Sequence, residues 1–192
     1  VSGAEGIGKV SAGLCALILI YAAFPIAQVV RSAGDSLASS KSAMVDFVFK
    51  DVVVESIKLF GHIAALTALF GAICSLVGWI LGSSGMMGGV DLHEVFPYLY
   101  GLPASAMAAF MGMLGLEFVG GVIEGFLSWD VTGSEASGYT VDGALAVGWE
   151  FVQVVIILAK LYVVLAFYHF FWGVLNTFFN WIKSPYLPFK SS

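Results

Sequence analysis

Residues 59–90 read LFGHIAALTALFGAICSLVGWILGSSGMMGGV, a run of 32 residues without one charged side chain. A helix needs about 20 predominantly apolar residues to cross the hydrocarbon core of a bilayer. Three further stretches also carry no charge, at 10–30, 95–116 and 161–182. The four stretches together predict an all-α polytopic membrane protein.

The composition of the whole chain agrees with this prediction. Of its 192 residues, 59% are hydrophobic and 11% are charged, whereas about 25% are charged in an ordinary soluble domain. A chain of this length predicts a single integral membrane domain, residues 1–192. The eight basic residues are scattered and the net charge is −5, which does not indicate nucleic-acid binding. We expect a bacterial inner membrane or an organelle membrane.

Small shifts of the uncharged stretches give four predicted transmembrane helices, near 10–30, 58–82, 104–129 and 150–172. Pro25 predicts a kink or an early end in the first of them, because proline lacks a backbone N–H. The first run is also longer than the hydrophobic region of 7–15 residues in a signal peptide. We therefore expect it to be a retained membrane helix.

The last apolar segment, 147–182, allows two segmentations. As a single helix its 36 residues would be about 54 Å long, whereas the hydrocarbon core is about 30 Å thick. Trp149 and Trp172 are spaced to lie in the two aromatic belts, which favours a span over 150–172. The rival span is 161–182, bounded by a lysine at each end.

Two segments predict amphipathic helices in the membrane interface. Residues 43–57 interleave charged with apolar side chains, as surface helices do, and this helix can also run directly into the second span. Residues 173–183 follow a glycine and are rich in aromatic side chains. With four spans the two sides of the membrane carry four and three basic residues, which leaves the orientation undetermined.

Small residues recur at helical spacing in the second and third predicted spans. Such residues let helix backbones approach closely within lipid. We therefore predict packing faces formed by Gly71, Ser75, Gly78, Gly82, Ala104, Ala108, Gly112, Gly121 and Gly125.

Charged residues inside the predicted spans are the strongest functional signal. Glu117 lies midway along the third span and Lys160 midway along the fourth. Each alone costs about 2.5–3.5 kcal/mol on insertion scales, and pairing offsets part of that cost. We therefore predict a Glu117–Lys160 contact between these two helices. Glu124, two turns after Glu117, extends the polar seam.

Three interpretations of this seam remain open. The first is a structural pair, within the chain or with a charge of a partner subunit. The second is an ion or proton path, because carboxylates in a dry site can carry protons. The third follows from the rival segmentation, in which Lys160 only extends its amine to the membrane boundary.

His62 and His169 are weak candidates for cofactor ligands, because two histidines on different helices can hold a haem. With four single spans the two residues lie near opposite membrane faces, and they approach the same face only if 96–129 is a re-entrant hairpin. We predict no cofactor, with haem or chlorophyll as the alternative, and hydrogen-bonded interfacial histidines as the plainer interpretation.

Three further motifs have plain interpretations. Residues 3–9 resemble a phosphate loop, but Val10 replaces the required hydroxyl and no strand precedes it; a flexible glycine-rich segment is expected. Residues 91–94 read DLHE, which we interpret as a solvated acidic loop, with no metal site predicted. Cys15 and Cys74 lie in apolar stretches, so buried thiols are expected there.

We predict a structural or assembly subunit of a larger multi-protein membrane complex. Its expected partners are the lipid bilayer and other membrane subunits or copies of itself. The alternative is a small oligomeric channel or transporter subunit that uses the intramembrane charges for ion or proton translocation. No constellation of serine, cysteine and histidine indicates an enzyme.

Overall fold

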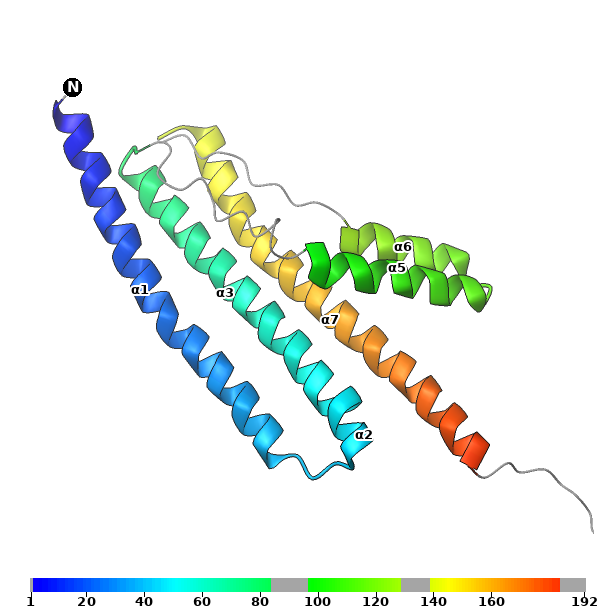
Figure 1. Ribbon diagram of the computed structural model, residues 1–192. Coiled ribbons are helices and arrows are strands. Elements are labelled where there is room, and N and C mark those ends of the chain that lie inside the picture. The colour runs from blue at the N-terminus through cyan, green and yellow to red at the C-terminus, as the bar shows by residue number, and fades with distance from the viewer. Residues whose placement is uncertain (1, 84–96, 129–138, 184–192) are drawn as a thin grey trace, which may run out of the picture.

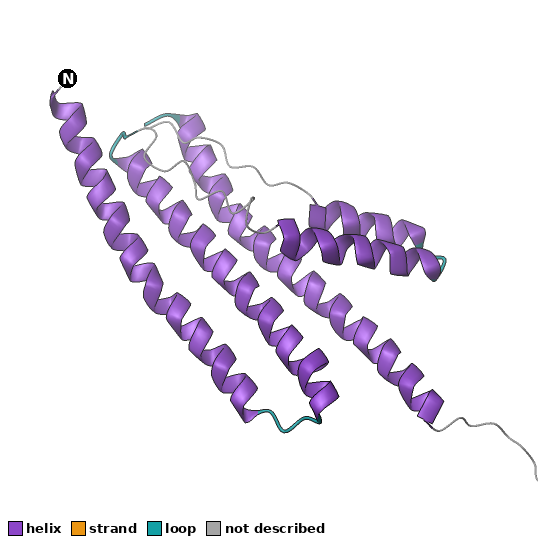
Figure 2. Ribbon diagram, in the orientation of Figure 1, coloured by secondary structure: helices purple, strands orange, loops and turns teal. Residues whose placement is uncertain are grey.

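Figures 1 and 2 show the fold as a computed structural model, in which three long helices lie side by side and a short helical hairpin crosses their flank. The structure describes residues 2–83, 97–128 and 139–183, and these contain helices and no strand. The elements are α1 (Ser2–Ser39), α2 (Met44–Asp46), the π-helix η1 (Phe47–Val52), α3 (Val53–Ile80), α5 (Pro97–Met113), α6 (Glu117–Ser128) and α7 (Val141–Lys183).

Three described helices are long and apolar enough to cross a membrane, over Gly6–Ser39, Met44–Ile80 and Val141–Ile182. The prediction of an all-α chain with several membrane helices is therefore confirmed. The second of them has 37 residues and is about 55 Å long at 1.5 Å per residue. Because this exceeds a hydrocarbon core of about 30 Å, each long helix tilts or extends beyond it.

The predicted third span, 104–129, is wrong as a single helix. The chain reverses at Gly115, whose φ is 73°, so that α5 and α6 form a hairpin (Figure 2). The N–H of Leu116 donates to the carbonyl of Met111 at 2.8 Å, and that of Gly115 to Gly112 at 3.0 Å. This pair of bonds is the Schellman motif, which ends a helix at a left-handed glycine. The structure therefore has three candidate crossings rather than four.

A second Schellman motif ends α3 close to residue 82, the predicted end of the second span. Gly82 has a φ of 65°, and the N–H of Ser83 donates to the carbonyl of Gly78 at 3.0 Å. Trp79 Nε1 then donates to the carbonyl of Thr140 at 3.2 Å. This bond places the start of α7 beside the end of α3, so α7 runs antiparallel to α3.

The two predicted interfacial helices are not separate elements. Residues 43–57 supply the first turns of the continuous helical run Met44–Ile80, and 173–183 supply the last turns of α7. Gly173 does not break α7, because the left-handed glycines in the described residues are Gly82 and Gly115. A single glycine with helical dihedral angles weakens a helix by only about 1 kcal/mol.

The N-terminal third of the chain is also more regular than predicted. The glycine-rich residues 3–9 belong to the first turns of α1, which continues for 14 residues beyond Pro25. A helical segment does not cradle a phosphate as a loop does, so the phosphate-loop resemblance has no structural counterpart. The motif at 91–94 lies outside the described residues.

The middle helix, α3, packs between α1 and α7 (Figure 1). On the α1 side, Cys15 and Cys74 are buried and free. The thiol of each approaches the backbone carbonyl of the other, at 3.7 and 3.9 Å. On the α7 side, Gly61 faces Leu161, which is fully buried. A Cβ at position 61 would lie 2.4 Å from a methyl carbon of Leu161, so this contact requires glycine.

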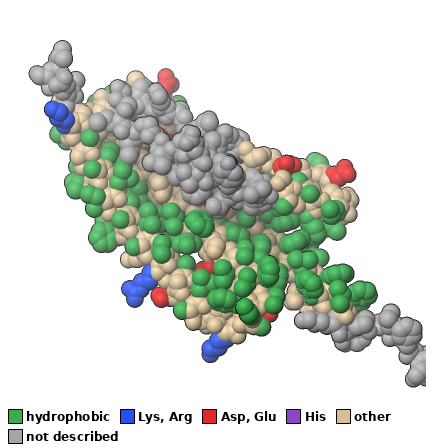
Figure 3. Space-filling model, viewed as in Figure 1, with side chains coloured by type: hydrophobic (Ala, Val, Ile, Leu, Met, Phe, Trp, Pro, Cys, Tyr) green, Lys and Arg blue, Asp and Glu red, His purple; other side chains and the backbone are tan. Residues whose placement is uncertain are grey.

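The three crossings redistribute the basic residues between the two ends of the helices. Arg31, Lys41, Lys50, Lys58 and Lys183 lie toward the end that carries the loop 40–43, Lys9 lies toward the opposite end, and 59–159 contain no lysine or arginine. On the face in Figure 3, basic side chains flank a broad apolar surface. The basic residues of the described helices therefore gather at the end of the bundle that carries the loop 40–43.

We predict that the native thiols Cys15 and Cys74 cross-link when copper phenanthroline oxidises the protein in membranes. The linked chain should migrate faster on a denaturing gel without reductant, because the bond closes a loop across α1 and α3. The variant Cys74→Ala is the control and should not shift. Cross-linking between two chains only would contradict the α1–α3 packing.

A second prediction concerns the number of crossings. In a chain whose native cysteines are alanine, a membrane-impermeant maleimide should label Ser42→Cys and Asn180→Cys from the same side, and Gly6→Cys from the opposite side. A four-span chain would instead place Asn180 with Gly6. Vesicles of known orientation supply both sides for comparison, and labelling after detergent lysis controls for reactivity.

Candidate functional site

Lys160 is the buried cation of the described helices. Its side chain is 7% exposed, and Nζ donates to the carbonyl of Leu127 at 3.2 Å. Leu127 lies in the last turn of α6, where carbonyls have no partner within the helix and the helix dipole favours a cation. Lys160 therefore fastens the end of the hairpin to α7.

Apolar contacts support the same junction. Ala104 and Met107 of α5, Leu127 of α6 and Val164 of α7 form one buried cluster. Phe110 then lies edge-on to Phe171, with ring centroids 5.1 Å apart. The hairpin thus packs on the middle of α7 through aliphatic and aromatic side chains.

The structure does not bring Glu117 to Lys160. Glu117 begins α6 immediately after the turn at Gly115, and its side chain is exposed. Ten residues, or about 15 Å of helix, separate it from Leu127. Glu124 is exposed as well. The predicted Glu117–Lys160 contact is therefore not formed within this chain, because the helix break carries Glu117 to the tip of the hairpin.

The hairpin also changes the relation between the two histidines. Because α7 runs antiparallel to α3, His62 and His169 do not lie near opposite ends of the bundle, as four single spans would place them. Gly61 packs against Leu161, so His169 lies about 12 Å further along α7 than the level of His62. His62 Nδ1 is 2.6 Å from the carbonyl of Lys58 on its own helix, and the structure does not bring the two imidazoles together.

The predicted small-residue faces divide into two groups. Ala104 is buried, and Ala108 contacts the hairpin partner at Gly120, where a Cβ would lie 3.1 Å from the carbonyl of Ala108. Ser75 is half-buried on α3. Two close helix–helix approaches, at Gly61 and Gly120, involve glycines that the predicted set omits.

The second group has no packing neighbour among the residues that the structure describes. A Cβ built on any of these glycines would have no heavy atom of another element within 4 Å. They are Gly71, Gly112, Gly121 and Gly125. Gly78 and Gly82 belong to the turn that ends α3, with Gly82 against the ring of Tyr139.

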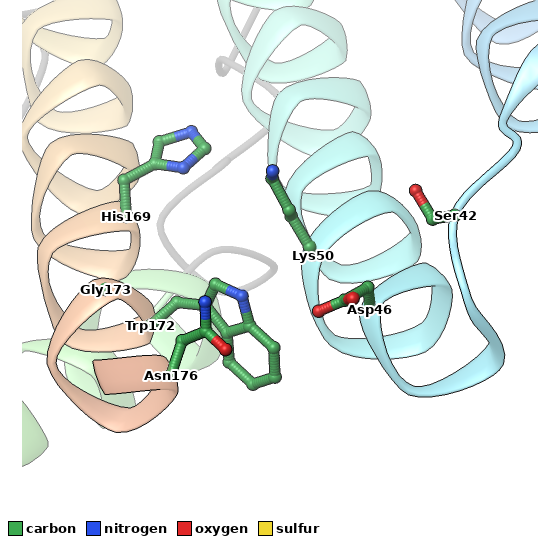
Figure 4. Close-up of a pocket in the computed structure, with 7 residues that line it drawn as sticks. All are labelled: Ser42, Asp46, Lys50, His169, Trp172, Gly173 and Asn176. Carbon is green, nitrogen blue, oxygen red and sulfur yellow. The ribbon is translucent and has the colours of Figure 1, made fainter. Parts of the chain in front are cut away.

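Two adjacent polar hollows, of about 440 and 390 Å³, lie at the end of the bundle that carries the loop 40–43. The larger one, named here the loop-end hollow, lies between η1 and α7 (Figure 4). Its lining residues are Ser42, Asp46, Lys50, His169, Trp172, Gly173 and Asn176. Ser42, Lys50 and His169 also line the smaller hollow.

The π-helix η1 shapes this end of the molecule. Its six residues wind more widely than an α-helix, a feature that is frequent at functional sites. Two contacts hold it to α7: the hydroxyl of Tyr168 donates to the carbonyl of Phe49, and Phe49 stacks on Trp172 with ring centroids 5.6 Å apart. These contacts fix the wall of the loop-end hollow that carries Lys50.

The charges of the two hollows differ in their pairing. In the smaller one, Lys58 pairs with Glu55 at 3.0 Å, and the hydroxyl of Ser40 donates to Asp51. In the loop-end hollow, Asp46 and Lys50 form no ion pair with any described residue. Their spacing of four suggests only the solvated face of a helix, so sequence reasoning missed this site. The opposite wall of the hollow, on α7, begins at His169, which follows Lys50 by 119 residues in the sequence.

We predict that Lys160→Met loosens the hairpin while α3 and α7 stay paired. The variant loses a hydrogen bond from a charged donor, a contribution of about 1.5–3 kcal/mol, partly offset because it also removes a buried charge. Hydrogen exchange of the α6 amides should accelerate about tenfold. Lys58→Met, which disturbs an ion pair within α3, is the control; unchanged α6 exchange in Lys160→Met would contradict the proposed anchor.

No protein family, curated protein or solved structure matches this chain. Its function is therefore argued from the geometry of its helices.

Proposed function

We propose that this chain is an integral membrane assembly subunit whose open helix faces pack against other membrane subunits. The observation that carries the proposal is the set of glycines with empty space beside them, represented by Gly71 on α3 and Gly121 on α6. In lipid, small residues contribute mainly by letting another backbone approach. A glycine in a helix also costs about 0.5–1 kcal/mol of stability relative to alanine. A row of glycines that packed against nothing would therefore destabilise the helix without a compensating contact.

The low internal burial of the long helices supports the same proposal. In the most apolar windows of the three candidate spans, 17%, 28% and 22% of the residues are buried. α1 contributes one narrow seam, with Ser11, Cys15 and Ala22 buried, and most of its other side chains are exposed. The bundle therefore offers much more helix surface to its surroundings than it uses internally.

The rival function is a homo-oligomeric channel that uses the intramembrane charges. Glu117 and Glu124 are exposed on the hairpin, and Lys160 lies at its other end against α7. Within the described ranges 2–83, 97–128 and 139–183, these three groups do not line one continuous polar path. The assembly role is therefore better supported than ion or proton translocation.

The two functions differ in what surrounds the chain after extraction in a mild detergent. An assembly subunit is expected in a particle of fixed stoichiometry with other membrane proteins, measured by native mass spectrometry. A channel is expected as copies of this chain alone, with ion or proton flux in liposomes. Flux by a purified homo-oligomer would overturn the proposal.

We predict that Gly71→Leu abolishes this particle without unfolding the chain. Nothing within 4 Å meets a Cβ at position 71, so the monomer has room for the side chain whereas a closely packed partner helix has not. Gly71→Ala is the matched control, because it keeps a small residue, and it should retain most of the particle.

A third substitution on α3 separates loss of assembly from loss of folding. Gly61→Leu meets Leu161 directly and should destabilise the chain itself, measured by thermal unfolding in detergent. An intact particle in Gly71→Leu, or unfolding equal to that of Gly61→Leu, would contradict the assignment of Gly71 to a subunit interface.

A further inference from the structure

The loop-end hollow holds one cation and one anion that the rest of the described chain leaves unpaired. Lys50 is exposed and Asp46 is half-buried, and neither forms an ion pair with a described residue. Figure 4 shows both on the helix that faces α7, with His169, Trp172 and Asn176 on the opposite wall. Opposite charges in one hollow, not paired with each other, offer a site for a ligand.

The pair of charges selects the chemistry of that ligand. A simple anion is attracted by Lys50 and repelled by Asp46. A simple cation is attracted by Asp46 and repelled by Lys50. A zwitterion with its two charges a few atoms apart satisfies both groups, and hydrogen bonds to charged groups are the stronger kind. Asn176, Ser42 and His169 add neutral groups that can hydrogen-bond its oxygens.

The position of the hollow indicates where the ligand comes from. It lies at the basic end of the bundle, beside Trp172 and Tyr168, which are side chains typical of the membrane interface. Apolar side chains on the adjoining surface are about half exposed, namely Val48, Phe49 and Phe170. Such a surface can receive acyl chains while a headgroup occupies the hollow.

We propose that the loop-end hollow binds the headgroup of a zwitterionic phospholipid that carries a phosphate diester and a primary ammonium group. Lys50 binds the phosphate, supported by Asn176 and His169. Asp46 accepts hydrogen bonds from the ammonium, and the Trp172 ring lies where it can contact that cation.

Three phospholipids with the same acyl chains test this assignment. Phosphatidylethanolamine has both groups, phosphatidylglycerol lacks the ammonium, and phosphatidylcholine has a cation without N–H donors. Binding of each to the delipidated full chain in detergent is measured by native mass spectrometry. We expect phosphatidylethanolamine to bind about tenfold more tightly than the other two, as one charge-assisted hydrogen bond predicts.

Substitutions assign the two charges separately. Asp46→Asn should remove the preference for phosphatidylethanolamine over phosphatidylglycerol, and Lys50→Gln should weaken both about tenfold. Matched controls are Asp35→Asn and Arg31→Gln, an exposed ion pair on α1 outside the hollow, which should leave binding unchanged. The Cys15–Cys74 cross-link reports that each variant keeps its fold.

Several outcomes would overturn the proposal. Equal or tighter binding of phosphatidylglycerol would show an anion site without ammonium recognition. Unchanged binding in both hollow variants would place the lipid elsewhere. Competition by free phosphoethanolamine at concentrations equal to those of the lipid would show a site for a soluble ligand.

Discussion

The left-handed conformation of Gly115 is the constraint on which the arrangement of the chain depends. It ends α5 and reverses the direction of the backbone, so that α6 packs along α5 instead of extending it into a third crossing. With the hairpin set apart from the long helices, α7 starts beside Trp79 and runs antiparallel to α3. The number of crossings, the relation of His62 to His169 and the asymmetry of basic residues all follow from this one turn. A straight helix over 104–129 would change each of them.

Close packing then determines how the long helices meet. Gly61 brings α3 against Leu161, and reciprocal thiol contacts join Cys15 to Cys74 on the other side of α3. The buried amine of Lys160 ties the hairpin to α7 through the backbone of Leu127. In place of the predicted contact with Glu117, the amine of Lys160 meets a helix C-terminus, where the helix dipole favours a cation.

The open glycines and the loop-end hollow have different physical roles. Gly71 and Gly121 leave space at the helix surface, and the backbone of a partner helix can fill that space more closely than lipid can. Asp46 and Lys50 offer charge, which a lipid headgroup uses under the proposal above. We infer that assembly proceeds through the apolar faces along the long helices, and that the polar end of the bundle contacts lipid headgroups.

The local pattern of charged and apolar residues was sufficient to predict that the chain is helical. The uncharged runs at 10–30 and 59–90 identify two membrane helices because a bilayer excludes charge over about 20 residues. The buried Lys160 stands out for the same reason, and the glycine run after Gly82 marks the end of α3 because glycine tolerates the left-handed conformation. The helical content and the single buried lysine were therefore predictable from the sequence.

Only the tertiary structure decided which residues of the chain contact one another. Gly115 lies among other glycines, and only the surrounding hydrogen bonds single it out as the turn that separates Glu117 from Lys160. Gly61 and Gly120 pack tightly whereas Gly71 and Gly121 do not, although their spacing gives no distinction. The loop-end hollow joins Lys50 to His169 across more than half the chain. Sequence alone thus determined that the chain consists of long apolar helices, because a bilayer excludes charge over about 20 residues, and the long-range contacts decided how many of them are continuous and which side chains meet.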